Sequence, residues 1–225
     1  MALWNKKKKE YSDGRIYEGN LLDGIPNGNG IMRFPNGDYH EGEWMGGVLN
    51  GNAKGITNNI KFEGTFVNGH LNGNGKAMYS DGSRYEGEWK EDKREGFGKY
   101  WCSDGCFYEG EWKNGEPSGK GKYRHPDGFV YEGDMLNGDR CGNGKMYYPD
   151  GNLMLEGTWN KDFPIRGTRY FIDGSRYEGE FKAYIMHGRG TYYFEDGEYF
   201  VGVFEENLPI SGTRYSADGN AKPET

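Results

Sequence analysis

The sequence predicts an all-β fold: a single-layer, elongated and twisted antiparallel β-meander built from about nine hairpin repeats of about 23 residues. Residues 81–89 (DGSRYEGEW) return as residues 104–112 (DGCFYEGEW) and, more weakly, as residues 173–181 (DGSRYEGEF). Self-similarity at a fixed period of this length indicates a repeat architecture. One glycine of the motif recurs at steps of 22 to 24 residues: Gly19, Gly42, Gly64, Gly87, Gly110, Gly133, Gly157, Gly179 and Gly202.

The composition favours a thin sheet. Hydrophobic residues make up 34% of the chain and 40 of its 225 residues are glycine, so we do not expect a thick two-layer core. Aromatic residues make up 16%, which suits a sheet whose rings lie flat over glycines. Glycine-rich disorder is the alternative, but low-complexity disorder is poor in aromatic residues and lacks a strict period.

Each repeat is expected to contain two strands. Residues 108–112 (YEGEW) alternate large and charged side chains at period two, which is typical of a half-buried strand. A Gly-x-Gly-x-Tyr segment, as at 119–123, forms the second strand. Pro126-Asp127-Gly128 between one repeat and the next predicts a three-residue hairpin loop, in which a type I turn is followed by a left-handed glycine.

This loop length predicts the register of the strands. With residues 103–105 as the loop, Tyr100 faces Tyr108, Lys99 faces Glu109, and Gly98 faces Gly110. A two-residue loop would place Glu109 opposite Tyr100 and change every partner, so the three-residue register is preferred. Tyr, Gly and Trp then share one face, and Glu and Lys the other. The polar segments 90–95 and 113–118 form the second loops, where we expect partner specificity.

The chain is divided into a lysine-rich lead-in with a partial repeat (1–14), nine repeats as one continuous sheet (15–219) and a frayed tail (220–225). The second repeat has His40 at the Tyr position, Ala53 at the second Gly, and Asn58-Asn59 in place of the Asp-Gly turn. Leu155 replaces Tyr in the seventh repeat, where we expect a bend. The ninth is expected to act as a cap, because terminal repeats are usually atypical.

Charge and composition exclude several classes of function. The formal net charge of −7 argues against a nucleic-acid partner. No apolar run approaches eighteen residues and no secretory signal is evident, so we expect an intracellular, cytoplasmic protein. Cys102 and Cys106 flank a turn as cross-strand neighbours. They are expected to be free thiols in a reducing compartment, with a disulfide as the alternative, and Cys141 is expected to be incidental.

No catalytic or metal-binding constellation is evident, so the sequence predicts neither an enzyme nor a cofactor. The histidines His40, His70, His125 and His187 are not paired with a nucleophile or a carboxylate dyad, and no cluster has metal-ligand spacing. The Gly-x-Gly segments open strands, whereas a phosphate cradle leads into a helix. The carboxylates recur in every repeat, which indicates a role in the fold.

Residues 108–128 carry the clearest copy of the motif, from Tyr108-Glu109-Gly110-Glu111-Trp112 through Gly119-Lys120-Gly121 to Asp127-Gly128. This pattern resembles the MORN (membrane occupation and recognition nexus) repeat family. The resemblance implies a repeat scaffold, because proteins made of little else are often cytoskeletal or ciliary scaffolds, including radial-spoke components of axonemes. Some relatives tether myosin tails, and others are linked with membranes or acidic phospholipid. Related repeats also precede histone methyltransferase and lipid-kinase domains.

The preferred hypothesis is a non-catalytic scaffold or adaptor in a cytoskeletal or ciliary assembly, with a peptide or helix of a partner protein lying along an aromatic groove. The candidate contacts, which could equally serve only packing within the sheet, are Trp44, Tyr85, Trp89, Tyr108, Trp112, Tyr131, Trp159 and Tyr177.

Three alternatives stay open. A membrane or phospholipid tether would use a patch formed by Lys6, Lys7, Lys8 and Lys9, although these lysines could simply form a solvated edge. A regulatory subunit of a separate enzyme is the second alternative, since about six residues follow Gly219. Self-association through the terminal edge strands is the third.

Overall fold

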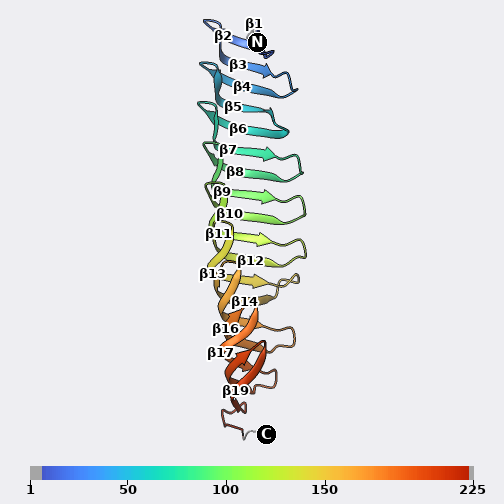
Figure 1. The fold of residues 1–225 in the computed structure, drawn as a ribbon, viewed down its shortest axis with the longest axis vertical. Helices are drawn as coiled ribbons and strands as arrows, with labels where there is room; N and C mark the ends of the chain where they lie inside the picture. Colours follow the sequence, from blue (N-terminus) through green and yellow to red (C-terminus); the bar gives the residue numbers. More distant parts are fainter. Residues whose placement is uncertain (1–6, 223–225) are drawn as a thin grey trace. The chain divides into compact units, whose positions relative to one another are not determined.

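The computed structural model describes residues 7–222 (Figure 1). These residues form nineteen β-strands. None of them belongs to a helix, and hence none to a helix that could span a membrane. Two compact units divide the chain, Met1–Glu116 and Pro117–Thr225.

The first unit is an antiparallel meander in which each described strand pairs with its neighbours in the sequence. Figure 1 shows these strands in sequence order, coloured from blue to green. They are β1 (Lys7–Glu10), β2 (Ile16–Leu22), β3 (Ile25–Arg33), β4 (Tyr39–Met45), β5 (Val48–Thr57), β6 (Ile60–Val67), β7 (His70–Met78), β8 (Arg84–Lys90), β9 (Lys93–Trp101) and β10 (Phe107–Lys113).

The second unit is built in the same way. Its strands are β11 (Glu116–Arg124), β12 (Val130–Leu136), β13 (Asp139–Tyr147), β14 (Leu153–Asn160), β15 (Phe163–Tyr170), β16 (Arg176–Lys182), β17 (Ile185–Tyr193), β18 (Tyr199–Glu205) and β19 (Leu208–Tyr215). Both units therefore have the all-β antiparallel meander that the sequence predicts.

The Asp-Gly loops have the predicted conformation. Between β7 and β8, the Tyr79 amide donates to the Ser83 carbonyl (2.9 Å) and the Gly82 amide donates to the Tyr79 carbonyl (3.0 Å). Gly82 has φ 88°, a left-handed conformation that favours glycine. The Asp81 carboxylate accepts from the Ser83 amide and hydroxyl, which explains why Asp precedes Gly in this turn.

The predicted register is confirmed. Tyr100 lies opposite Tyr108, Lys99 opposite Glu109, and Gly98 opposite Gly110. The Lys99 and Glu109 side chains form an ion pair of 2.8 Å on the charged face. Such exposed pairs contribute little to stability, so the loop geometry and the packing of the other face determine the register.

The second connections are shorter than the six-residue loops expected from the sequence. Glu91 and Asp92 alone form the turn between β8 and β9, both with positive φ, because a two-residue type I′ turn matches the twist of the strands. The two additional residues of β9 are taken up by an irregularity between Gly87 and Trp89, where residues 95–97 lie opposite Glu88 alone. Glu88 at the bulge accepts a hydrogen bond from the Phe97 amide (2.9 Å). This acid therefore completes the backbone pairing that the bulge interrupts.

Departures from the repeat have local structural consequences. Asn58 and Asn59 form a two-residue turn with φ of 50° and 64°, in agreement with the shortened loop expected there. The 24-residue step before Gly157 is accommodated by a register shift between Met146 and Tyr147, close to the repeat where a bend is expected. The bend, the capping role of the last repeat, and the division into 1–14, 15–219 and 220–225 stay predictions.

The end of the described chain is hydrogen-bonded to β19. The Ser216 amide donates to the Asn220 carbonyl, and the Lys222 amide donates to the Arg214 carbonyl. Ala221 forms a bridge with Tyr215. The frayed tail expected over 220–225 is thus backbone-bonded as far as Lys222, and residues 223–225 lie outside the described part.

Candidate functional site: an apolar groove on the tyrosine face

Tyrosine rings cover pairs of glycines on one face of the meander, which we call the tyrosine face. Tyr85 is completely buried, and its hydroxyl oxygen lies only 2.2 Å from the place where a Cβ on Gly98 would be. The same hydroxyl donates to the carbonyl of Glu88 (3.0 Å). Tyr17, Tyr108, Tyr131 and Tyr177 donate in the same way to the carbonyl three residues ahead. The motif tyrosine is therefore a packing and hydrogen-bonding element of the repeat.

Burial changes the acidity of these phenols. It raises the pKa of Tyr17 and of Tyr177 to about 12, and it raises the pKa of Tyr85, Tyr108 and Tyr131 as well. The hydroxyls therefore stay protonated at neutral pH and act as donors to backbone carbonyls.

The eight aromatic residues singled out in the sequence are all buried, with exposures between 0% and 8%. The tryptophans mostly bond to the sheet: the indole nitrogens of Trp44, Trp112 and Trp159 donate to the carbonyls of Gly30, Gly98 and Gly144. The Trp89 indole N–H has no hydrogen-bond partner among the described residues. The structure gives these residues a packing role, and their role as partner contacts stays a prediction.

A groove of about 550 Å³ opens on the tyrosine face of the first unit, where His40 and Phe62 stand in place of the motif tyrosine. The rings form a series: Phe34 to His40 (4.7 Å between centroids), His40 to Phe62 (5.2 Å) and Phe62 to Phe66 (5.3 Å). Met32, Ile60 and Tyr79 add to the walls, and Trp44 and Trp89 lie beneath them. Where the sequence departs from the repeat, the face is left hollow and apolar.

Few charged groups line this groove. Arg15 forms an ion pair with Asp13 (2.8 Å), and Asp92 accepts from the imidazole of His70 (2.6 Å). The other titratable lining groups are Tyr79 and His40, and the Nε2 of His40 lies 2.7 Å from the hydroxyl oxygen of Thr57. The groove therefore favours an apolar occupant over a strongly charged one.

Burial lowers the pKa of His40, although the nearby Asp38 carboxylate acts in the opposite direction. The unfolded chain therefore takes up a proton at higher pH than the folded chain. We expect stability to fall as the pH drops below about 6.5, the ordinary value for histidine. The check is the urea midpoint of unfolding at pH 7.5 and 5.5. From pH 7.5 to pH 5.5, the urea midpoint of the wild-type chain should fall further than that of His40→Leu. This substitution copies Leu155, which stands at the same position in the seventh repeat. Equal losses would contradict the prediction.

A second hollow of about 530 Å³ lies on the tyrosine face of the second unit. Its lining is more polar, because Arg140 and Asp162 face it and form an ion pair of 3.0 Å. The Arg140 guanidinium also lies 5.3 Å from the Trp159 ring centroid. This ion pair belongs to the lining of the second hollow, whereas the groove of the first unit is lined mainly by apolar side chains.

The lysine patch is only partly described. Lys6 lies outside the described residues, whereas Lys7, Lys8 and Lys9 belong to β1. Lys8 pairs with Glu10 (2.7 Å), and the Lys9 ammonium donates to the Gly24 carbonyl and lies 4.8 Å from the Tyr11 ring centroid. Two of these lysines thus have partners within the unit.

The cysteines flanking a turn differ from expectation. Cys102 and Cys106 form a disulfide across the loop between β9 and β10, where free thiols were expected. Their ligand atoms and a carboxylate oxygen of Asp104 lie within 4.8 Å of one another. The spacing Cys-x-Asp-x-Cys across a turn is the sequence signal that places these three residues together. Cys141 is a free thiol.

Comparisons with known proteins agree with the repeat. The family model described as MORN repeat matches residues 17–39, 40–54, 62–84, 85–107, 108–130, 131–153 and 177–199. These seven segments cover more than half of the chain. The model does not match the stretch around Leu155 or the residues after 199, yet β14, β15, β18 and β19 are present there.

No curated protein sequence matches the chain. Among solved structures, a mutant TCP10 domain of CPAP from Danio rerio is similar at 15% identity and a TM-score of 0.32, over 97% of this chain and 98% of that one. The SAS-4 (dCPAP) TCP domain of Drosophila melanogaster, solved with a proline-rich motif of Ana2, is similar at 12% identity and a TM-score of 0.30, over 100% and 92%. At these TM-scores neither likeness informs the function of this chain. The repeat itself does identify the protein: the chain belongs to the MORN repeat family.

Proposed function

We propose that this protein is a non-catalytic repeat scaffold that binds an apolar segment of a partner protein in the groove of its first unit. The observation that supports this is the groove of about 550 Å³ on the tyrosine face of the first unit, whose lining is more apolar than that of the hollow in the second unit. In the first unit the groove lies where His40 and Phe62 replace the motif tyrosine, so a partner finds room where the repeat pattern is interrupted. A groove of this size accommodates a few apolar side chains of a peptide or helix.

The setting that we propose is a cytoskeletal or ciliary assembly, as the family resemblance implies, with the repeats serving as a rigid support. We propose no catalysis, because the sequence has no nucleophile and base pair and the motif tyrosines stay protonated. The membrane alternative has weaker support, since Lys8 and Lys9 contact groups of their own unit.

The decisive variant places a charge in the groove without removing a core ring. Ile60 is half-buried at the Asn58-Asn59 turn, so Ile60→Glu should leave the sheet folded and lower the affinity for an apolar peptide at least tenfold. Peptides would be selected from a random display library against the wild-type chain, and their affinities measured by fluorescence anisotropy.

Met78→Glu is the matched control, because Met78 is 46% exposed and points away from the tyrosine face in β7. It should leave the affinity unchanged. Peptides that bind all three forms equally would place binding outside the groove. Binding of anionic vesicles with no selectable peptide would support the phospholipid tether instead.

A further inference from the structure

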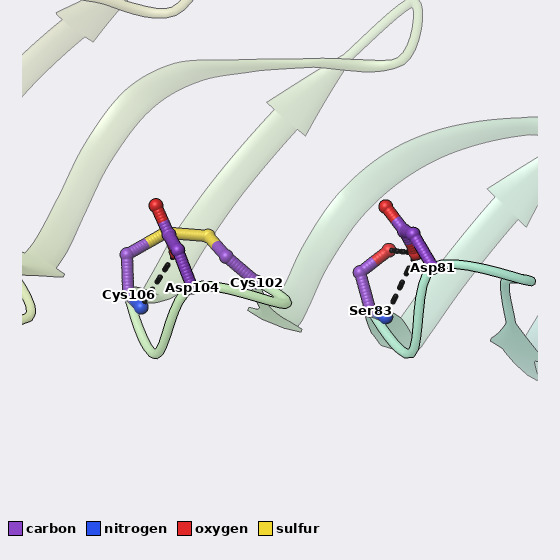
Figure 2. Close-up of a disulfide and its surroundings, with 5 residues drawn as sticks. All are labelled: Asp81, Ser83, Cys102, Asp104 and Cys106. Atoms are coloured by element: carbon purple, nitrogen blue, oxygen red, sulfur yellow. Dashed lines mark hydrogen bonds between the residues drawn. A yellow bond between two sulfur atoms is a disulfide. The ribbon is translucent and has the colours of Figure 1, made fainter.

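The turn between β9 and β10 keeps its shape without help from the disulfide. The Cys102 amide donates to the Cys106 carbonyl (3.0 Å), and the Gly105 amide donates to the Cys102 carbonyl (3.2 Å). The loop between Tyr79 and Ser83 has the same two hydrogen bonds and no cysteine. Figure 2 shows both loops in the same conformation. Cleavage of the S–S bond therefore leaves two thiols on neighbouring strands with Cα atoms 5.0 Å apart.

Asp104 adds a third ligand on the same side of the turn. In Figure 2 its carboxylate lies beside the disulfide, and its Oδ1 accepts from the Cys106 amide (3.1 Å). That bond orients the carboxylate, while Oδ2 has no hydrogen bond or ion pair within residues 7–222. The two sulfurs and a carboxylate oxygen lie within 4.8 Å of one another. Cys102 is half-exposed, Asp104 is exposed and Cys106 is buried, so solvent reaches the cluster from the side of Cys102 and Asp104.

We propose that the reduced Cys102–Cys106 pair and Asp104 form a binding site for a thiophilic divalent cation such as Zn²⁺. Two thiolates and one carboxylate, with water as the fourth ligand, meet the tetrahedral preference of Zn²⁺. Zinc–sulfur bonds of about 2.3 Å place the two sulfurs roughly 3.8 Å apart, and rotation about the two Cα–Cβ bonds supplies this separation. The Cys106 amide serves as the outer-shell partner that holds the carboxylate in place.

The site is under redox control. A dithiol reductant gives two electrons and two protons to the S–S bond and becomes a disulfide itself, so Cys102 and Cys106 become thiols. Binding of the cation then releases the two thiol protons and forms two metal–sulfur bonds. An oxidant of the disulfide class reverses the sequence, removes the two electrons and expels the cation.

The test uses the full chain in a Cys141→Ser background, so that the pair holds the only thiols. After reduction by a water-soluble phosphine and its removal under nitrogen, Co²⁺ is added as a spectroscopic probe and Zn²⁺ as its competitor. We expect one Co²⁺ per chain, with a thiolate-to-metal charge-transfer band that Zn²⁺ abolishes. The oxidised chain should show no such band.

Three variants separate the ligands from the fold. Cys102→Ser/Cys106→Ser should lose binding and stay folded, since Ser216 and Ser83 occupy the same positions in other loops. Asp104→Asn keeps the Oδ1 acceptor and should weaken binding at least tenfold. Asp81→Asn, in the loop without cysteines, should leave Co²⁺ binding unchanged. The proposal is overturned by a reduced chain that binds no Co²⁺, or by a double serine variant, folded by circular dichroism, that binds as tightly as its parent.

Discussion

Replacement of Gly98 by alanine is expected to destabilise the first unit by about 3 kcal/mol. The new Cβ would lie 2.2 Å from the Tyr85 hydroxyl and 2.5 Å from its ring, and neither can retreat, because Tyr85 is completely buried. The displacement would also cost the hydrogen bond from that hydroxyl to the Glu88 carbonyl, worth about 1 kcal/mol. The free energy of unfolding from urea titration is the measurement.

Two controls identify the cause. Gly105→Ala places a Cβ in open space at φ 95° and should cost only the backbone strain, about 1 kcal/mol. Tyr85→His/Gly98→Ala copies the native combination of His40 and Ala53 in the second repeat and should recover part of the loss. If Gly98→Ala were no worse than Gly105→Ala, contact between the tyrosine ring and the glycine pair would not limit stability.

Truncation of Trp112 to alanine should have an even larger effect, about 4 kcal/mol. Its ring is 4% exposed and lies 5.2 Å from the ring centroids of both Tyr85 and Tyr108, and its indole N–H bonds to the Gly98 carbonyl. The Arg94 guanidinium stacks on it at 4.3 Å. The loss combines a cavity, two aromatic contacts and the hydrogen bond from the indole to the Gly98 carbonyl. The measurement is the free energy of unfolding from chemical denaturation. Far-ultraviolet circular dichroism follows the transition, because tryptophan fluorescence would differ between the variants.

Trp112→Phe copies Phe66 and Phe204, which occupy this position in other repeats, and should cost less than half as much. Trp101→Ala is the size-matched control, since Trp101 is only half-buried on the opposite face. Similar losses for Trp101→Ala and Trp112→Ala would show that the tyrosine face is not the dominant core. Because Trp112→Ala weakens the fold itself, a binding defect in that variant cannot identify a partner surface, whereas Ile60→Glu can.

The register was predictable from the sequence because two independent signals agree. The Asp-Gly loop defines the geometry of the hairpin, and the pairs Lys99 with Glu109 and Gly98 with Gly110 are consistent only with a three-residue loop. For the second connection, between the Trp strand and the Gly-x-Gly strand of a repeat, the sequence offers no pair of facing residues that tests the loop length. Between Gly87 and Gly98 the chain length fits either a six-residue loop or a two-residue turn with a bulge, and the hydrogen bond from the Phe97 amide to Glu88 decides for the bulge.

The candidate site was predictable only in part. The alternation of side chains placed Tyr85 and Trp112 on one face, but it could not show that their rings would cover the glycines completely and leave no surface for a partner. The groove depends instead on His40 and Phe62, which stand in place of the motif tyrosine. Whether a ring on the tyrosine face is exposed depends on the side chains of three or four neighbouring strands. The sequence of one repeat is therefore not enough to predict where a groove forms.

Pairing between sequence neighbours has a consequence for how the chain is made. In both units each described strand finds its partners within about one repeat, so native contacts are local in the sequence. Local contacts require little loop-closure entropy and favour rapid folding. When a few repeats have emerged from the ribosome, nearly all of the strands with which they pair have emerged as well. The chain can therefore fold during synthesis, because each folded hairpin presents an edge strand with which the next hairpin pairs.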